Sequence, residues 1–204
     1  MEKEGKTCMR EWSNEPRLSS LSGVASIDHD GKKTLTFMTS SERADVLLTK
    51  GGLIQKVSFF DARNGHSEIF PDVARHLSVG EGNCERRVTH FLMPGGPAPT
   101  MRLGITRHDG MGTWSSLPHD FENNPETGFE EIFFYTLEGG TKRAIQVGKG
   151  LWCDGSKVDS FWPVYDQTFG MVPMGYHPIV GEPGVRVSYV WVYLAKHPHW
   201  EKVK

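Results

Sequence analysis

Two stretches of the chain carry side chains that could bind a divalent metal ion. Residues 112–135 read GTWSSLPHDFENNPETGFEEIFFY and contain His119 and, at the head of an aromatic run, Glu131. Residues 172–178 read VPMGYHP and place His177 directly after a turn that contains glycine. Imidazole nitrogens and carboxylate oxygens are ordinary ligands of zinc, manganese and iron. Two histidines with one or two carboxylates therefore predict a site with three or four protein ligands.

The order of the motifs around these residues is more informative than the ligand types, because the chain holds nine histidines. TWSS, LPH, FEEIFFY and VPMGYHP follow one another, with RVTH at 87–90 before them and YVWVY at 189–193 after them. This order resembles the second cupin domain of the 5-deoxy-glucuronate isomerase family of inositol catabolism, which is related to the 5-keto-4-deoxyuronate isomerases. The resemblance covers residues 86–195, about half of the chain.

The resemblance implies four metal ligands, and the chain departs from the family at one of them. The family has His-x-His after the Trp-Ser-Ser segment; the first histidine aligns with His119 and the second with Phe121, whose phenyl ring cannot bind a metal. A shift of the alignment by one residue places Glu122 at the position of the second histidine, and its carboxylate can bind a metal. Glu131 and His177 match the remaining glutamate and histidine ligands. We expect these four to bind manganese, iron, nickel or zinc, with the added oxygen favouring manganese or iron(II).

The aromatic run that follows Glu131 is also expected to contribute to substrate binding. In an extended strand, Glu131, Phe133 and Tyr135 share one face. A carboxylate beside two rings is expected to face the interior of a β-barrel, where Phe133 and Tyr135 would contact a substrate. The other reading of Glu131 is an inward carboxylate paired with Arg143, and that of His119 is a loop histidine satisfied by backbone or water.

The implied reaction is aldose–ketose isomerisation of an acidic sugar. It moves a proton between adjacent carbons, so a base is required beside the metal, and Glu122, Tyr176 or an unligated histidine are the candidates. A cation should hold the sugar carboxylate. Arg143 is the first candidate by strand position, with Lys142 and Arg107 as alternatives.

The elements that must position these residues are short strands. Runs of β-forming residues alternate with Gly, Pro and Asn turns from residue 33 onward, and no helix longer than a turn or two is predicted. The class is therefore all-β, a cupin-type β-barrel or jelly roll. We expect an irregular arm over 1–30, a shortened N-terminal β portion over 31–85 with one helical turn at 72–77, and the cupin domain over 86–204. Turns are predicted at 162–163 and 174–176.

Composition excludes several classes of partner. The formal net charge is −2 and no block of Lys or Arg occurs, so nucleic acid is not expected. No apolar run approaches the length of a bilayer span, and residues 1–12 lack the apolar core of a signal peptide, so we expect a cytoplasmic protein. Three separated cysteines predict neither a disulfide framework nor a thiolate zinc site.

These observations lead to one expected function and two alternatives. The resemblance implies a metal-assisted isomerase of a sugar or sugar acid, working as a homodimer in inositol catabolism. An iron-dependent dioxygenase could use the same ligands but would need open positions for oxygen. A sugar-binding cupin without catalysis would follow if the phenylalanine at position 121 has cost the chain its metal.

Overall fold

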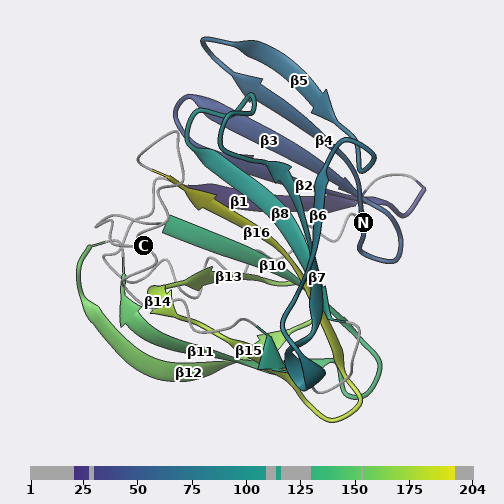
Figure 1. Cartoon of the computed structure of the whole chain (residues 1–204), viewed down its shortest axis with the longest axis vertical. Coiled ribbons are helices and arrows are strands. Elements are labelled where there is room, and N and C mark those ends of the chain that lie inside the picture. Colours follow the sequence, from purple (N-terminus) through teal and green to yellow (C-terminus); the bar gives the residue numbers. More distant parts are fainter. Residues whose placement is uncertain (1–20, 28–29, 109–113, 116–129, 153, 196–204) are drawn as a thin grey trace.

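The computed structural model describes residues 21–27, 30–108, 114–115, 130–152 and 154–195, and their strands form three antiparallel sheets arranged in layers (Figure 1). The N-terminal sheet is a meander of β1 (Ser22–Ile27), β2 (Lys33–Met38), β3 (Glu42–Leu48), β4 (Ile54–Asp61) and β5 (Gly65–Ile69). The central sheet has the order β13 (Phe169–Val172), β10 (Glu130–Glu138), β16 (Arg186–Leu194), β8 (Met101–His108), β7 (Arg86–Leu92) and β6 (Arg75–Val79).

The third layer, called the facing sheet here, packs on the other side of the central sheet. Its order is β12 (Lys157–Tyr165), β11 (Arg143–Leu151), β15 (Ile179–Gly181) and β9 (Trp114–Ser115), and β14 (Met174–Tyr176) also pairs with β11. A short 3-10 helix, η1 (Gly82–Cys84), precedes β7. The all-β, cupin-type fold that the sequence predicts is confirmed, and none of the described helices is long and apolar enough to cross a membrane.

The central sheet is buried on both faces, which explains why β10 and β16 read as almost continuous apolar runs. On one face, Ile132, Phe134 and Val190 join a core cluster with side chains of the N-terminal sheet such as Phe37. On the other face, alternate residues join a second cluster with the facing sheet, among them Phe133, Tyr135, Tyr189, Trp191, Ala144, Trp162 and Ile179. The period-two alternation thus assigns each residue of these strands to one of two cores.

Glu42 fastens the N-terminal sheet to the central sheet. Its carboxylate is 3% exposed and accepts hydrogen bonds from the backbone N–H groups of Thr100, at 2.9 Å, and Met101, at 3.1 Å. The Thr100 hydroxyl also donates to it. Because β8 begins at Met101, this carboxylate fixes the start of a central strand to β3.

The turn between β3 and β4 makes a second contact between these two layers. Gly51 and Gly52 form the turn: Gly52 has φ +74, and its N–H donates to the Thr49 carbonyl oxygen at 2.9 Å. A Cβ atom at Gly52 would lie 2.8 Å from the Thr136 side chain on β10. Glycine is therefore required both by the backbone conformation and by the close packing.

Several local predictions need correction. Residues 22–27, placed in an irregular arm, form β1. The predicted helical turn at 72–77 is wrong because Arg75–Val79 form β6, which pairs with β7 in the central sheet. Part of the predicted N-terminal portion therefore belongs to that sheet.

The predicted turn at Pro163 is wrong because β12 runs through it as an edge strand, where a missing N–H costs no ladder bond. Residues 174–176, predicted as a turn, form β14.

Candidate metal site

Glu131 lies at the start of β10, on the face of the central sheet that turns toward the facing sheet. It pairs in register with Tyr193 of β16 and Val172 of β13, so strands flank it on both sides. The residue is 7% exposed. A carboxylate in this position has lost most of its contact with water, and it needs a hydrogen-bond donor, a proton or a cation.

His177 approaches Glu131 from the opposite layer, between β14 and β15. Gly175 shapes this approach, with φ +110 and a position where a Cβ atom would lie 2.7 Å from the Lys149 carbonyl oxygen. Only glycine combines this conformation with such close contact to β11. β14 pairs with β11, and His177 directly follows it. The His177 side chain lies in the interior and is 4% exposed.

Gln146 holds the backbone of His177 in place. Its side chain lies on β11, is fully buried, and donates from Nε2 to the carbonyl oxygens of His177, at 2.6 Å, and Pro178, at 3.0 Å. The Tyr135 hydroxyl donates to Gln146 Oε1 at 3.0 Å. Nε2 also donates to the Val147 carbonyl oxygen at 3.1 Å, so three carbonyls and one hydroxyl fix the orientation of the amide. A chain of hydrogen bonds runs from β10 through β11 to the loop that carries the histidine.

The pair itself has the geometry of two ligands of one metal ion. His177 Nε2 lies 3.6 Å from Glu131 Oε2. Two ligand atoms that are each about 2.1 Å from a tetrahedral ion are about 3.4 Å apart, close to this distance. Burial raises the pKa of Glu131 to about 8. The carboxylate form is therefore disfavoured without a cation, and a divalent ion would supply the missing charge. The two residues present fit a metal.

The other predicted ligands, His119 and Glu122, lie outside the described residues, as does Phe121. Within the ranges that the structure describes, no group of three or more His, Cys, Asp or Glu side chains could hold a metal ion. The described part of the chain thus contains two of the four predicted ligands, Glu131 and His177. The roles of His119 and Glu122 stay predictions.

The structure brings Phe133 and Tyr135 to the same interior as Glu131, as strand alternation predicts. They are 2% and 1% exposed. The Phe133 ring meets the His177 ring edge to face, with centroids 5.9 Å apart, and it stacks on Tyr189 at 4.3 Å. The Phe133 ring thus packs directly against the imidazole of the buried pair. Tyr176, the predicted base, is half-buried at the end of β14.

Arg143 does not come to this site, which counts against its predicted contact with a substrate. Its side chain is 58% exposed, and its Nε atom lies 3.5 Å from Glu182 Oε1. Residues of β11 alternate, and Ala144 and Gln146 occupy the inner face while Arg143 and Ile145 are exposed. The ion pair with Glu131 that the sequence left open is therefore replaced by one with Glu182.

Two residues on the inner face, Gln146 and Arg102, are not predicted from the sequence. Gln146 is a neutral side chain with no motif around it. Arg102 lies in register with Tyr193, which lies in register with Glu131, so the three form one row across β8, β16 and β10. Its guanidinium is 1% exposed and donates to the carbonyl oxygens of Ala98 and Met101. The alternation of residues 101–107 carried the signal for this arginine, because Met101 and Leu103 mark the opposite face.

The fold and the buried His–Glu pair define an all-β protein of the cupin type. The chain belongs to the KduI/IolB family, whose model matches residues 20–204. It is 31% identical over 126 residues to the 5-deoxy-glucuronate isomerase of Geobacillus kaustophilus, covering 60% of this chain and 44% of that protein. With the 5-deoxy-glucuronate isomerase of Bacillus subtilis strain 168 it shares 32% identity over 114 residues, or 54% and 41% of the two chains.

The chain therefore spans less than half of the length of these curated relatives. Among solved structures, an IolB-like protein from Salmonella typhimurium superposes with a TM-score of 0.59 at 18% identity, covering 91% of this chain and 75% of that one. At this identity the likeness supports the fold alone. The family resemblance that the motifs indicate is confirmed.

Proposed function

We propose that the chain is a sugar isomerase that interconverts the aldose and ketose forms of an acidic sugar with the help of a divalent metal ion. The observation that carries the proposal is the buried pair of Glu131 and His177, at the spacing of two ligands of one ion. Membership of the KduI/IolB family and the name of the curated relatives, 5-deoxy-glucuronate isomerase, support the same reaction.

In this proposal Glu131 and His177 hold the ion together with His119 and Glu122. Manganese, iron, nickel or zinc would act as a Lewis acid that stabilises the negative charge developing on the substrate oxygens. The role of Gln146 is to keep His177 in position through its two carbonyl acceptors. Phe133 and Tyr189 keep the site dry, which strengthens every charge interaction within it.

A base must take the proton from one substrate carbon and return it to the next. Glu122 and Tyr176 remain the proposed bases. Tyr176 directly precedes His177 at the end of β14, so it is near the ligand in the chain. The carboxylate of Glu122 could serve as a base only where it is not engaged as a ligand, so the two roles proposed for it exclude each other in one catalytic step.

Arg102 is a better candidate than Arg143 for holding the acidic group of the sugar. It is buried on the same face of the central sheet as Glu131, two strands away. Neighbouring strands are about 4.8 Å apart, so the backbones of the two residues are about 10 Å apart. A hexose-sized acid could extend between an ion at Glu131 and this guanidinium, which binds carboxylates with paired hydrogen bonds.

The test is an isomerase assay on metal-loaded protein, with 5-deoxy-glucuronate and glucuronate as substrates and NMR to identify the product. We expect an aldose–ketose equilibrium to be reached with wild type. Glu131→Gln should slow the reaction at least about 100-fold, because the ligand carboxylate is lost. Wild-type protein that carries a full complement of metal and yet leaves both sugars unchanged would contradict the proposal. Oxygen uptake in the presence of iron(II) would indicate a dioxygenase.

One observation favours a second function, a sugar-binding protein without catalysis. Phe121 stands where the family has a histidine ligand, so the chain could have lost its metal. Metal affinity measured for Phe121→His separates the two views. A gain of tenfold or more would mean that the wild-type site lacks a ligand at this position. No gain would favour either Glu122 as the substitute ligand or a binding protein without metal. Metal bound to the wild type would then favour Glu122, and its absence would favour the binding protein.

A homodimer located in the cytoplasm and acting in inositol catabolism completes the proposal. These parts rest on the resemblance to the isomerase family. Sedimentation of the purified chain would test the oligomeric state.

A further inference from the structure

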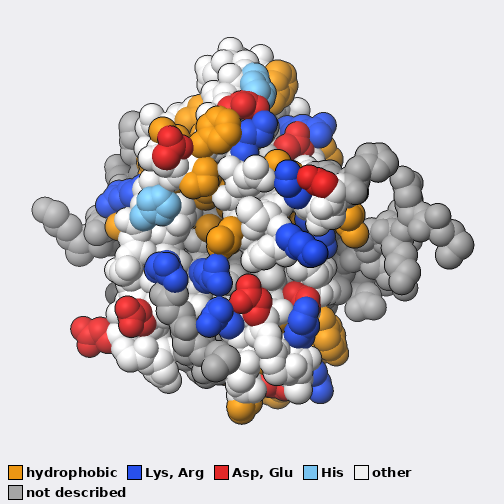
Figure 2. Space-filling model, turned by 90° about the vertical axis from the view of Figure 1, so that its right-hand side faces the viewer, with side chains coloured by type: hydrophobic (Ala, Val, Ile, Leu, Met, Phe, Trp, Pro, Cys, Tyr) orange, Lys and Arg blue, Asp and Glu red, His pale blue; other side chains and the backbone are white. Residues whose placement is uncertain are grey.

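The outer face of the facing sheet is apolar, although the solvent face of an antiparallel sheet is normally polar. Phe161 on β12 is 74% exposed and Tyr165 is 49% exposed. Pro163 between them and Ile145 on the neighbouring strand β11 are exposed as well. The two strands form the outermost layer at the bottom of Figure 1, and Figure 2 shows hydrophobic side chains beside charged ones at this end of the molecule. Exposed apolar surfaces of this kind often mark sites of interaction.

The exposed residues face one another across three strands. Phe161 lies opposite Val147, and Pro163 lies opposite Ile145. On its other side, Ile145 lies opposite Val180 of β15. Side chains that are directly opposite on one face of a sheet contact each other. They therefore form one continuous surface, called the apolar patch here, which consists of Ile145, Val147, Phe161, Pro163, Tyr165 and Val180.

The apolar patch has the size of the centre of a protein interface. Trp162 and Val164, which alternate with it along β12, belong to the second core, so the patch takes no part in that core. Phe and Tyr side chains each present about 200 Å² of surface, so Phe161 and Tyr165 together leave about 250 Å² in water. This is about a third of the roughly 800 Å² that one partner buries in a standard interface, where a polar rim surrounds an apolar centre.

The side chains of β11 and β12 on this face complement one another. Lys149 lies opposite Asp159, and Arg143 lies opposite Tyr165, whose ring can attract a cation. Between these two pairs, aliphatic residues of β11 lie opposite apolar residues of β12. A two-fold axis that runs between the two strands and parallel to them would place β12 of a second copy over β11 of the first. Each residue would then meet the copy of its own cross-strand partner, cation on anion and apolar on apolar.

We propose that two copies of the chain associate face to face through the apolar patch, with β11 of each copy over β12 of the other. Aligned packing of two sheets is a common way to bury such faces. Pairing through the free edge of β12 is disfavoured, because Pro163 interrupts the row of N–H donors. The inference rests on the homodimer of the proposed function and adds the surface that forms it. It does not depend on the metal, because the patch lies on the opposite face of β11 from the core that holds the candidate metal site.

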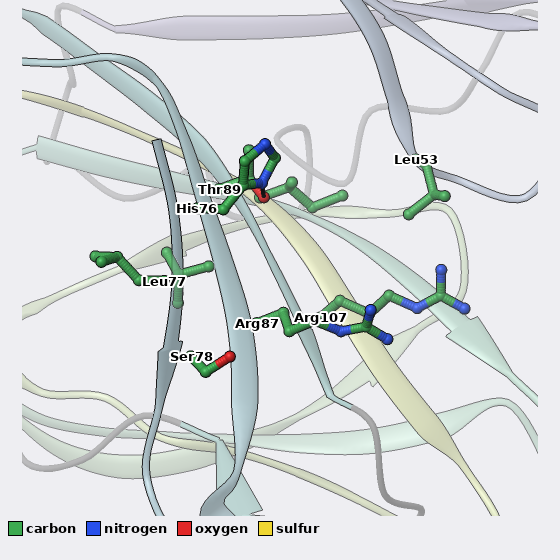
Figure 3. Close-up of a pocket in the computed structure, with 9 residues that line it drawn as sticks. Leu53, His76, Leu77, Ser78, Arg87, Thr89 and Arg107 are labelled. Carbon is green, nitrogen blue, oxygen red and sulfur yellow. Dashed lines mark hydrogen bonds between the residues drawn. The ribbon is translucent and has the colours of Figure 1, made fainter. Parts of the chain in front are cut away.

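The first test is sedimentation velocity of the full chain and its variants over a wide range of concentrations. Wild type should be a dimer. Phe161→Ser should raise the dissociation constant of the dimer at least about 30-fold, as expected for an aromatic residue at the centre of an interface. Phe60→Ser, the same change at an exposed position on β4, is the matched control. Leu53→Ser is a second control, in the pocket of about 290 Å³ that Leu53 and Ile105 line on the other side of the central sheet (Figure 3). Both controls should dimerise like wild type.

Charge reversal tests the arrangement of the two copies. Lys149→Glu sets two carboxylates against each other across the interface, and Asp159→Lys sets two ammonium groups against each other. Each variant alone should therefore dimerise at least about tenfold more weakly than wild type. A mixture of the two variants should restore the affinity, because every cation meets an anion in the mixed dimer.

Metal content, measured on the same samples, separates this inference from the proposed function. Phe161→Ser should keep the metal content of wild type while losing the dimer. A metal-free wild type that dimerises through the patch would support the interface and contradict the metal-dependent reaction. Wild type that is monomeric at every concentration, a dimer that Phe161→Ser leaves intact, or charge-reversed variants that fail to associate when mixed would overturn the inference.

Discussion

His177 Nε2 and Glu131 Oε2 lie 3.6 Å apart although the two residues belong to different layers of the molecule. Glu131 comes from the central sheet, and His177 from the loop between two strands of the facing sheet. A bound ion would therefore cross-link the two sheets. The metal site and the packing of the second core are therefore linked.

Metal content should depend on both members of the pair. Protein purified without chelators should contain close to one equivalent of manganese, iron, nickel or zinc, measured by mass spectrometry. His177→Ala and Glu131→Gln should lose most of it, since each removes a ligand. His66→Ala, at an exposed position on β5, is the control and should keep its metal. Wild type that is metal-free, and stays so after incubation with these ions, would exclude the metal-dependent mechanism.

The stability of the metal-free protein should fall between pH 5 and pH 8. Burial raises the pKa of Glu131 from 4.5 to about 8, so in this range the folded state keeps a proton that the unfolded state has released. The stabilisation is fully present below about pH 4.5 and is lost as the pH rises to 8, at most about 1.4 kcal/mol per pH unit. Urea unfolding in chelator measures it. Glu131→Gln cannot titrate, so its free energy of unfolding should depend less on pH than that of wild type. Identical pH profiles for the two proteins would contradict the raised pKa of Glu131.

Metal affinity should rise with pH, whereas the stability of the metal-free protein should fall. The carboxylate must lose its proton before it can bind an ion, so binding releases a proton below pH 8. We expect the apparent affinity to rise up to tenfold per pH unit between pH 6 and pH 8 and then to level off. Competition with a chelator of known pH dependence provides the measurement. Affinity that is constant over this range would show that Glu131 is not a ligand.

Gln146 should act as a positioning residue for His177. Gln146→Leu removes the donors to two carbonyl oxygens and should lower metal affinity 10- to 100-fold, as loss of such supporting hydrogen bonds does in other metal sites. Tyr135→Phe removes a single donor to Gln146 Oε1, so its effect should be smaller.

The same substitution at an exposed position, Gln55→Leu on β4, is the control for the change in composition. A Gln146→Leu protein that is less stable but binds metal as tightly as wild type would reduce Gln146 to a purely structural role.

Glu42→Ala should lower the free energy of unfolding by about 1–3 kcal/mol. The buried backbone donors of Thr100 and Met101 would be left without their acceptor, and the N-terminal sheet would lose a tie to β8. Denaturant unfolding measures the change. Glu68→Ala, which breaks an exposed ion pair with Lys56, should cost at most about 1 kcal/mol. Equal losses in the two variants would show that the interlayer contact contributes no more than a surface pair.

The sequence alone determined the class of the fold and which residues of the aromatic strand share a face. Alternation in residues 129–137 put Glu131, Phe133 and Tyr135 on one face, and the motif order assigned ligand roles to Glu131 and His177. The shared face is confirmed because strand geometry is local in the chain, and the structure places Glu131 and His177 side by side, while their roles as ligands stay predictions.

Tertiary structure decided which faces turn inward and what meets there. Arg143 and Ile145 alternate with Gln146 along β11, and packing turns the face of Arg143 to solvent and gives the interior to Gln146. A strand pattern specifies which side chains share a face, whereas the choice between the two faces depends on the layers that cover them. The same reason applies to Arg102, whose place in one row with Tyr193 and Glu131 results from the pairing of β8 with β16, a strand distant in the sequence.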